Sequence, residues 1–167
     1  MKLHQVPTEQ EIVTWRAFLR ANLLLEAYLD AGLQSEIGVT HSGFLVMTLL
    51  YEEGEEGLSM TDIAALTQFS RSRLSHLISR LEEDKYVVRK SSTFDRRSQI
   101  ALLTLAGKKT VEIATPYYHS ILRDLFLDRM SNQELNTIQK FMVSIVNNTG
   151  KMVNELDRDR PTREIAI

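Results

Sequence analysis

The chain of 167 residues is long enough to bury the core of one compact domain. Hydrophobic residues make up 43% of it and charged residues 25%, as in ordinary globular proteins, and its longest apolar runs fall far short of the ~20 residues that cross a membrane. Cysteine is absent, which excludes disulfides and thiolate metal sites within the chain, and without an apolar leader at its start the expected location is the cytoplasm.

The net charge of −2 is unevenly distributed along the chain. Between Ser70 and Arg97, eight lysines and arginines stand against four acidic residues, so this segment carries +4 and the remainder −6. A basic segment within an acidic chain is typical of a surface that contacts phosphate groups. We therefore expect a nucleic acid as the partner of this segment.

In chain order, the first expected element is a long helix. Thr8-x-x-Glu11 has the form of a capping box, in which side chain and backbone groups at the start of a helix satisfy one another. Apolar residues then recur at helical spacing as far as Leu33. Either Gly32 or Gly38 would end this helix.

A second helix is expected from Thr40 to Tyr51, before the acidic turn EEGEEG. Ser59 then caps a short third helix, MTDIAALTQ. A brief turn leads directly into a fourth expected helix, RSRLSHLISRLEED. Two helices joined by a brief turn form the helix-turn-helix pattern.

A β-hairpin with a charged tip follows these helices. Its parts are β-rich YVVRKSS, polar TFDRR and alternating SQIALLTL. Thr104 would cap a long helix to Leu127 that kinks at Pro116, and Ser131 would cap a last helix near 132–149. The predicted fold class is mainly α with a small β-hairpin (α+β): a winged helix-turn-helix with long N- and C-terminal dimerisation helices.

We expect a single domain over residues 1–167. Residues 40–103 would form the winged helix-turn-helix lobe that binds DNA. Residues 8–38 and 104–150 would be mainly dimerisation helices, because they hold more apolar residues than so small a lobe needs for its own core. Residues 151–167 form a charged tail.

The helix after the turn carries the candidate face for reading DNA. If Leu74, Leu77, Ile78 and Leu81 form its buried stripe, then hydroxyls, an imidazole and guanidinium groups point outward. These groups suit the major groove, where arginine reads guanine. A single helix with this pattern is more often just an exposed amphipathic helix, but the preceding helix, the cap and the basic hairpin together favour DNA binding. The candidates are Ser70, Arg71, Ser72, Arg73, Ser75, His76, Ser79 and Arg80.

The hairpin adds Lys90 and, at its tip, Asp95, Arg96 and Arg97. An arginine at the tip could enter the minor groove, where the negative potential is enhanced. Asp95 would hold Arg97 in place by accepting a hydrogen bond from it. The alternative is a solvated turn, in which aspartate is favoured for its local hydrogen bonds.

The motifs DRR at 95–97 and LTxxG at 103–107 together resemble the wing signature of the MarR (multiple antibiotic resistance regulator) family. The segment LSMTDIAALTQFSRSRLSHLISRLEEDKYVVRK is similar to that family's helix-turn-helix, and the helix order agrees over roughly residues 10–150. The resemblance implies a homodimeric regulator of transcription, usually a repressor, that binds a palindromic operator. Lys85 stands where members commonly carry a glycine, so we expect a left-handed backbone conformation there.

The resemblance also implies an effector, since many members release DNA when a small phenolic or aryl-carboxylate ligand binds between the dimerisation helices and the winged helix. The candidate lining residues are Trp15, Arg16, His41, Phe44 and Tyr51. Aromatic side chains with one cation suit a planar anion. For each residue taken alone, core packing or surface exposure is the competing interpretation.

No metal and no cofactor are expected. The peroxide-sensing branch of the family uses a cysteine, which this chain lacks. Its four histidines, His4, His41, His76 and His119, show no metal-ligand spacing such as i, i+4.

Two other functions are open at this point. A winged helix can dock to protein without binding DNA, although such a module has no reason to keep two arginines at its tip. An enzyme is disfavoured: Ser72 and His76 lie one helical turn apart, but the sequence has no Gly-x-Ser-x-Gly elbow and no glycine-rich phosphate loop.

Overall fold

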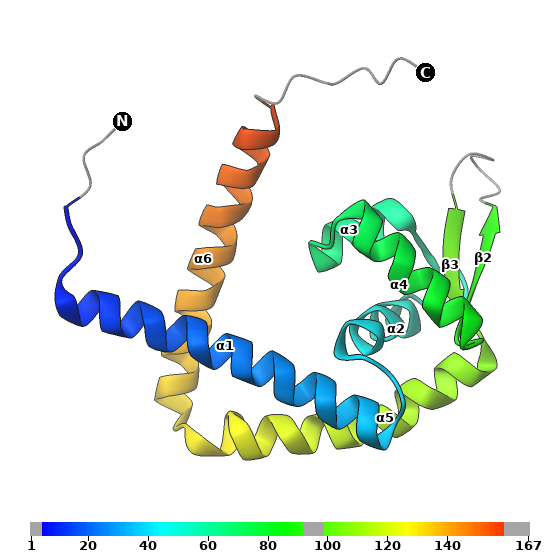
Figure 1. Cartoon of the computed structure of the whole chain (residues 1–167), viewed down its shortest axis with the longest axis horizontal. Coiled ribbons are helices and arrows are strands. Elements are labelled where there is room, and N and C mark those ends of the chain that lie inside the picture. Colours follow the sequence, from blue (N-terminus) through cyan, green and yellow to red (C-terminus); the bar gives the residue numbers. More distant parts are fainter. Residues whose placement is uncertain (1–4, 92–98, 159–167) are drawn as a thin grey trace. The chain divides into compact units, whose positions relative to one another are not determined.

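The computed structural model describes the backbone of residues 5–91 and 99–158 and the side chains of these residues up to 149 (Figure 1). The fold is mostly helical with one small antiparallel sheet, which confirms the predicted class. By its contacts the chain divides into two compact units, residues 1–121 and 122–167. Within the described ranges, no helix has the length and apolar character needed to cross a membrane.

Helix α1 spans Glu9–Glu36 and starts at the predicted capping box. The Glu11 amide donates to the Thr8 hydroxyl at 3.3 Å, and the Thr8 amide donates to the Glu11 carboxylate at 2.7 Å. Of the two glycines that could end the helix, Gly38 does so, with a φ of +83° just beyond it. Gly32 lies inside α1, where a β-carbon would come within 2.8 Å of the Tyr117 hydroxyl.

Each of the next three helices begins after a hydroxyl cap, and two of these caps, Ser59 and Ser70, were predicted. The three helices are α2 (His41–Glu53), α3 (Met60–Thr67) and α4 (Arg71–Glu83). The hydroxyls of Thr40, Ser59 and Ser70 each accept a hydrogen bond from an amide of the first turn. Helix α2 packs against α1, α3, α4 and the sheet, so it occupies the centre of the first unit. The largest fully buried side chains are Leu33, Val46, Met47, Leu50, Ile63, Leu74, Ile78 and Val87.

The wing is a three-stranded sheet, whereas the sequence predicted a two-stranded hairpin. Strands β2 (Val87–Ser91) and β3 (Gln99–Leu103) form the expected hairpin, and a short strand β1 (Leu58–Ser59) pairs with the other edge of β3. Two residues, the second of which is itself the cap of α3, carry no strand periodicity, so β1 is defined only by its pairing. Gly57 makes this pairing possible because it adopts a φ of +67° against the Ala101 carbonyl.

Helix α5 spans Leu105–Leu125 and contains Pro116 without ending there. A 3₁₀ turn, η1 (Leu127–Arg129), follows it, so α5 ends slightly before the predicted Leu127. Helix α6 spans Asn132–Arg158 and starts at the predicted cap, where the Glu134 amide donates to the Ser131 hydroxyl at 3.3 Å. It extends beyond the predicted end near 149 and continues through Gly150, because a lone glycine in a helix costs only about 1 kcal/mol.

Candidate nucleic-acid interface

Helix α4 presents the polar face that the sequence predicted. Leu74, Ile78 and Leu81 are buried and Leu77 is half-buried, which confirms the apolar stripe. The six candidates on the exposed side are Arg71, Ser72, Arg73, Ser75, His76 and Arg80. Ser70 is also exposed, but its hydroxyl caps the helix by accepting from the Arg73 amide at 3.2 Å. Ser79 is half-buried.

The guanidinium of Arg73 is held by two other parts of the chain. Its Nη2 donates to the Ser42 hydroxyl at 2.8 Å, and its central carbon lies 4.0 Å from the centre of the Phe69 ring. Ser42 belongs to the first turn of α2, and Phe69 to the turn between α3 and α4. This bond occupies one of the five N–H donors of the guanidinium.

Glu82 and Arg89 join α4, the recognition helix of the helix-turn-helix, to strand β2 of the wing. The Arg89 amide donates to Glu82 Oε1 at 2.9 Å, and its Nε donates to Oε2 at 2.7 Å. The Arg89 Nη2 donates to the Ser79 hydroxyl at 3.2 Å. The hydrogen bond from the Arg89 side chain lowers the pKa of Glu82 below its ordinary value, so Glu82 is a carboxylate at neutral pH.

Sequence reasoning did not find this pair. Glu82 and Arg89 have opposite charges and lie on either side of the turn between α4 and β2. These opposite charges are the only signal of an ion pair that the sequence offers. Most pairs of opposite charge at a protein surface contribute little, so this signal is weak without the backbone geometry of the turn.

A hollow between α3, α4 and the sheet is lined in part by donor groups, from Thr61, Arg71, Ser75 and Gln99. Arg71 is the first residue of α4, where backbone amides have no partner within the helix. Guanidinium, hydroxyl and amide donors at a helix N-terminus suit a phosphate group. Lys90 is exposed on the neighbouring strand β2.

The turn from α4 to β2 contains the left-handed backbone conformation that the sequence predicted at Lys85. Lys85 has a φ of +62°, which confirms its left-handed conformation. The Tyr86 amide donates to the Leu81 carbonyl and the Lys85 amide to the Glu82 carbonyl, both at 2.9 Å. These two bonds form a Schellman motif, which fixes the direction in which β2 leaves the helix.

The LTxxG motif holds this turn against the start of α5. The Thr104 hydroxyl donates to the Lys85 carbonyl at 2.7 Å and accepts from the Gly107 amide at 3.0 Å. The Thr104 amide donates to the Tyr86 carbonyl at 3.0 Å. The motif therefore joins the C-terminal end of the recognition helix to α5, and its role in the described part of the chain is structural.

The predicted wing-tip residues Asp95, Arg96 and Arg97 lie outside the described residues. The described strands end at Ser91 on one side and resume at Gln99 on the other.

Two of the five candidate ligand residues lie together in the core. His41 and Phe44 are buried, and both pack on Tyr118, with ring centres 5.6 and 5.0 Å from it. His41 Nδ1 lies 2.8 Å from a carboxylate oxygen of Glu26 on α1. Burial, with the Glu26 charge as a smaller contribution, raises the pKa of Tyr118.

The other three candidates lie elsewhere in the first unit. Trp15 and Arg16 are exposed, and Trp15 precedes Glu26 by eleven residues of α1, about 16 Å of helix. Tyr51 is at the far end of α2 from His41, about 15 Å away by the same measure, where it donates to Glu112 at 3.1 Å. The structure does not bring the five residues into one cluster.

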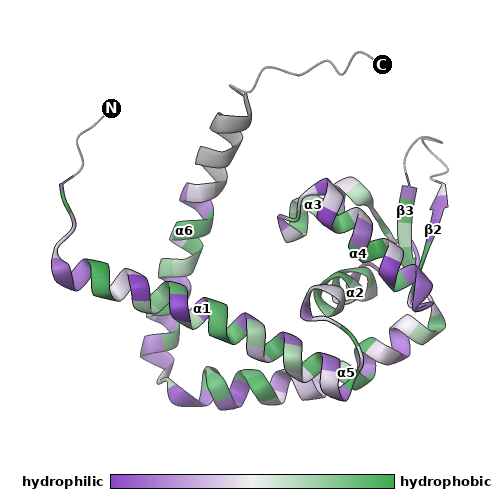
Figure 2. Cartoon of the chain, in the orientation of Figure 1, coloured by the Kyte–Doolittle hydropathy of each residue, from purple (hydrophilic) through white to green (hydrophobic). Residues whose placement is uncertain are grey.

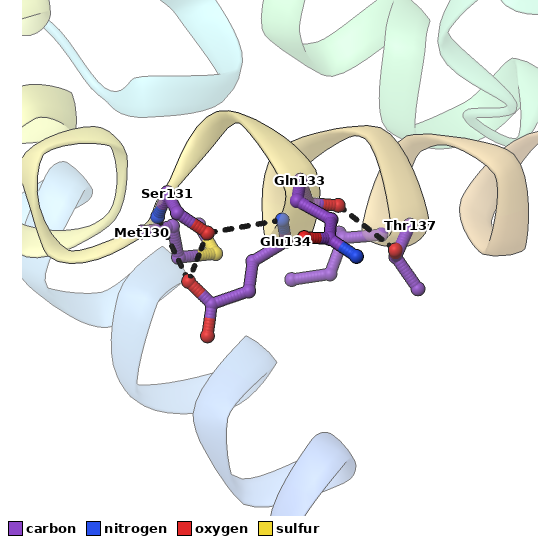
Figure 3. A pocket seen from close by; sticks show the side chains of 6 residues that line it. Met130, Ser131, Gln133, Glu134 and Thr137 are labelled. Atoms are coloured by element: carbon purple, nitrogen blue, oxygen red, sulfur yellow. Dashed lines mark hydrogen bonds between the residues drawn. The ribbon is translucent and has the colours of Figure 1, made fainter.

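The second unit contains a hollow at the start of α6 (Figure 3). Its polar groups bond mainly to one another: Ser131 donates to Glu134, and the Thr137 hydroxyl donates to the Gln133 carbonyl at 2.8 Å. It therefore belongs to the helix cap. Across the described residues, no group of three or more His, Cys, Asp or Glu side chains is arranged to hold a metal ion.

A capped helix-turn-helix followed by an antiparallel wing defines a winged helix-turn-helix protein. The sequence profile described as the MarR family matches residues 37–98. The chain is similar to two solved structures from Streptomyces coelicolor. Sco3205, a MarR family transcriptional regulator in complex with DNA, is 29% identical, with a TM-score of 0.85 and coverage of 89% of this chain and 92% of that one.

The second structure, AbsC, is a MarR family transcriptional regulator that is 31% identical, with a TM-score of 0.81 and coverage of 89% of this chain and 99% of that one. The HTH-type transcriptional regulator PrsX from Escherichia coli is 27% identical over 117 residues, 70% of each chain. The chain belongs to the MarR family. It is a transcriptional regulator and not an enzyme.

Proposed function

We propose that this regulator acts in the cytoplasm as a homodimer, binds a palindromic DNA operator and represses the gene that this operator controls. A bound dimer covers about two turns of duplex, which would block access to a promoter that contains the operator. The observation that carries the proposal is the exposed polar face of α4, with Arg71 and amides that have no partner within the helix at its N-terminus.

The roles proposed for individual residues follow from their positions. Ser75, His76 and Arg80 on the outer face of α4 suit contacts to base edges in the major groove. Arg71 and Lys90 flank this face and suit phosphate contacts, which fix the protein on the duplex without reading sequence. Arg97, outside the described residues, keeps its proposed place in the minor groove. Sco3205 was solved in complex with DNA, which supports DNA as the partner of this chain.

Dimerisation is supported by the hydrophobic residues along α1 and α6 (Figure 2), several of which are exposed. They include Trp15, Leu23 and Tyr28 on α1, and Phe141 and Val146 on α6; Leu23 is 73% exposed and Val146 68%. Helices with such faces need a partner in water. In a two-fold dimer the recognition helices would meet successive major grooves about 34 Å apart, so the operator would be an inverted repeat.

Release by a small phenolic or aryl-carboxylate ligand is supported by the cluster of His41, Phe44 and Tyr118. The Nε2 atom of His41 is buried and has no hydrogen-bond partner among the described residues. A buried polar atom without a partner is destabilising, and a ligand that supplied one would bind there preferentially.

DNase footprinting on the promoter region of the protein's own gene tests the proposal, with Arg97→Ala run beside the parent. Protection of an inverted repeat by the parent, lost in the variant, is the expected result. Absence of protection on the whole promoter at low salt, where phosphate contacts are strongest, followed by an empty genome-wide DNA pull-down, would favour a protein-docking module.

A further inference from the structure

We propose that Arg73 is a positioning residue of the recognition helix, which fixes the N-terminus of α4 on the N-terminus of α2 through its bond to Ser42. This inference rests on the proposed binding of DNA by α4. It assigns to Arg73 a role other than reading a base, although base reading is the role that the sequence favoured.

Two partners from different elements hold the same guanidinium. Ser42 accepts a hydrogen bond from Nη2 at 2.8 Å, and the central carbon of the guanidinium lies over the Phe69 ring, 4.0 Å from its centre. Phe69 is itself half-buried against the core. A planar guanidinium can make an in-plane hydrogen bond and stack on a ring at once, which a lysine cannot do.

Ser42 is a firm anchor because the residue before it is bound to α1. His41 is only 5% exposed, and its amide donates to a carboxylate oxygen of Asp30 at 2.7 Å. Its Nδ1 lies 2.8 Å from the Glu26 carboxylate. Two adjacent residues in the first turn of α2 thus bind two different helices, α1 and α4.

The bond supplies a direction that apolar packing between α2 and α4 lacks. Where the two helices meet, Leu77 and Leu81 of α4 lie beside Gly43 of α2, with Leu81 the nearer. Apolar contacts of this kind are not directional and allow one helix to rotate slightly on the other. A hydrogen bond restricts both distance and angle, so it fixes the orientation in which α4 presents Arg71 and Ser75.

The two roles of Arg73 predict opposite effects of a change at Ser42. If Arg73 positions α4, loss of the Ser42 hydroxyl weakens binding to every duplex and leaves the preferred sequence unchanged. If Arg73 reads a base, loss of Ser42 frees the guanidinium and does not weaken binding.

The experiment compares the parent with Ser42→Ala, Arg73→Ala and the double variant, all as full chains. The probes are a duplex that the parent selects from a random-sequence library and a scrambled duplex. We expect each single variant to weaken binding to the selected duplex about tenfold and the double variant to be no weaker than either single one. Each variant should select the same sequence as the parent, and Ser42→Thr, which keeps the hydroxyl, should bind like the parent.

Ser35→Ala, which changes an exposed serine on α1, is the matched control and should bind as the parent does. Unchanged affinity in Ser42→Ala, together with a new preferred sequence for Arg73→Ala, would overturn the proposal. Thermal unfolding of each variant identifies any weakening of binding that is due to misfolding.

A second measurement separates this inference from the proposed function, because it needs no DNA. Hydrogen exchange at the amides of Leu74 and Ser75, in the first turns of α4, should be faster in Ser42→Ala than in the parent and Ser35→Ala. Equal exchange would overturn the positioning role even if the parent binds DNA. Faster exchange in a protein that binds no duplex would sustain the positioning role while the proposed function fails.

Discussion

Gly107 lies directly against the Tyr86 carbonyl, where a β-carbon would overlap the carbonyl oxygen and come within 2.7 Å of Leu103 Cδ2. The last residue of the LTxxG motif is therefore a glycine because the helix α5 starts in contact with the backbone that leaves α4. This contact joins the recognition helix, the wing and α5 at one point.

Gly107→Ala should lower the free energy of unfolding by about 2–3 kcal/mol, since the contact is with backbone and the overlap has no flexible side chain to relieve it. Urea denaturation measures this decrease. Gly43→Ala is the control: its β-carbon would meet the Thr40 hydroxyl at 3.0 Å, and the gain in helix propensity offsets this tighter contact. Equal effects of the two changes would contradict the structure at Gly107.

Lys85→Gly should raise the free energy of unfolding by about 0.5–1 kcal/mol. Lys85 has a φ of +62°, a conformation that a side chain disfavours and glycine adopts freely. Chemical denaturation of the variant against the parent measures the increase. Lys85→Ala removes the same charge but keeps the backbone cost, so it should show no comparable increase; a similar increase in both variants would point to the charge instead.

Stability should fall in acid partly through Glu82. The hydrogen bond from Arg89 lowers the pKa of Glu82 in the folded protein, so this contribution is present above the unfolded-state pKa and is lost as the pH falls through the lower folded-state value. Unfolding free energies of the parent and Glu82→Gln should thus differ most at neutral pH and converge between about pH 5 and pH 3. A difference independent of pH would exclude the ion pair as its source.

Lys90→Ala should weaken binding to every duplex by a similar factor, because a lysine that binds phosphate carries no sequence information. The slope of log Kd against log salt should fall by about one, since the variant neutralises one phosphate fewer and releases correspondingly fewer counterions. Titrations at several salt concentrations measure both effects. Lys109→Ala removes an exposed lysine on α5 and should leave the slope unchanged; weaker binding to one sequence only would show that Lys90 reads a base.

If the protein forms the proposed dimer through α1, Leu23→Arg should shift it to a monomer. Leu23 is 73% exposed on α1, and burying two leucines across a two-fold interface contributes enough that a charge at both positions weakens association about a hundredfold or more. Sedimentation of the 19.2 kDa chain measures the change in mass. Leu66→Arg places the same charge on α3, where leucine is also exposed, and should leave the mass unaltered.

The sequence alone determined the elements whose signals are local. The caps at Thr8, Ser59 and Ser70, the apolar stripe of α4 and the left-handed turn at Lys85 each depend on residues within one or two helical turns. Such features are set by backbone sterics and by short-range hydrogen bonds, so they can be read before the fold is known.

Only the tertiary structure decided which residues meet across the chain. Strand β1 exists because β3 pairs with it, Glu82 binds Arg89 because the turn brings them together, and Arg73 reaches Ser42, thirty-one residues earlier. The sequence placed Arg73 on the correct face of α4 but left its partner open. The physical reason is that a side-chain hydrogen bond acts only over about 3 Å, and packing of distant segments decides which groups come within that distance.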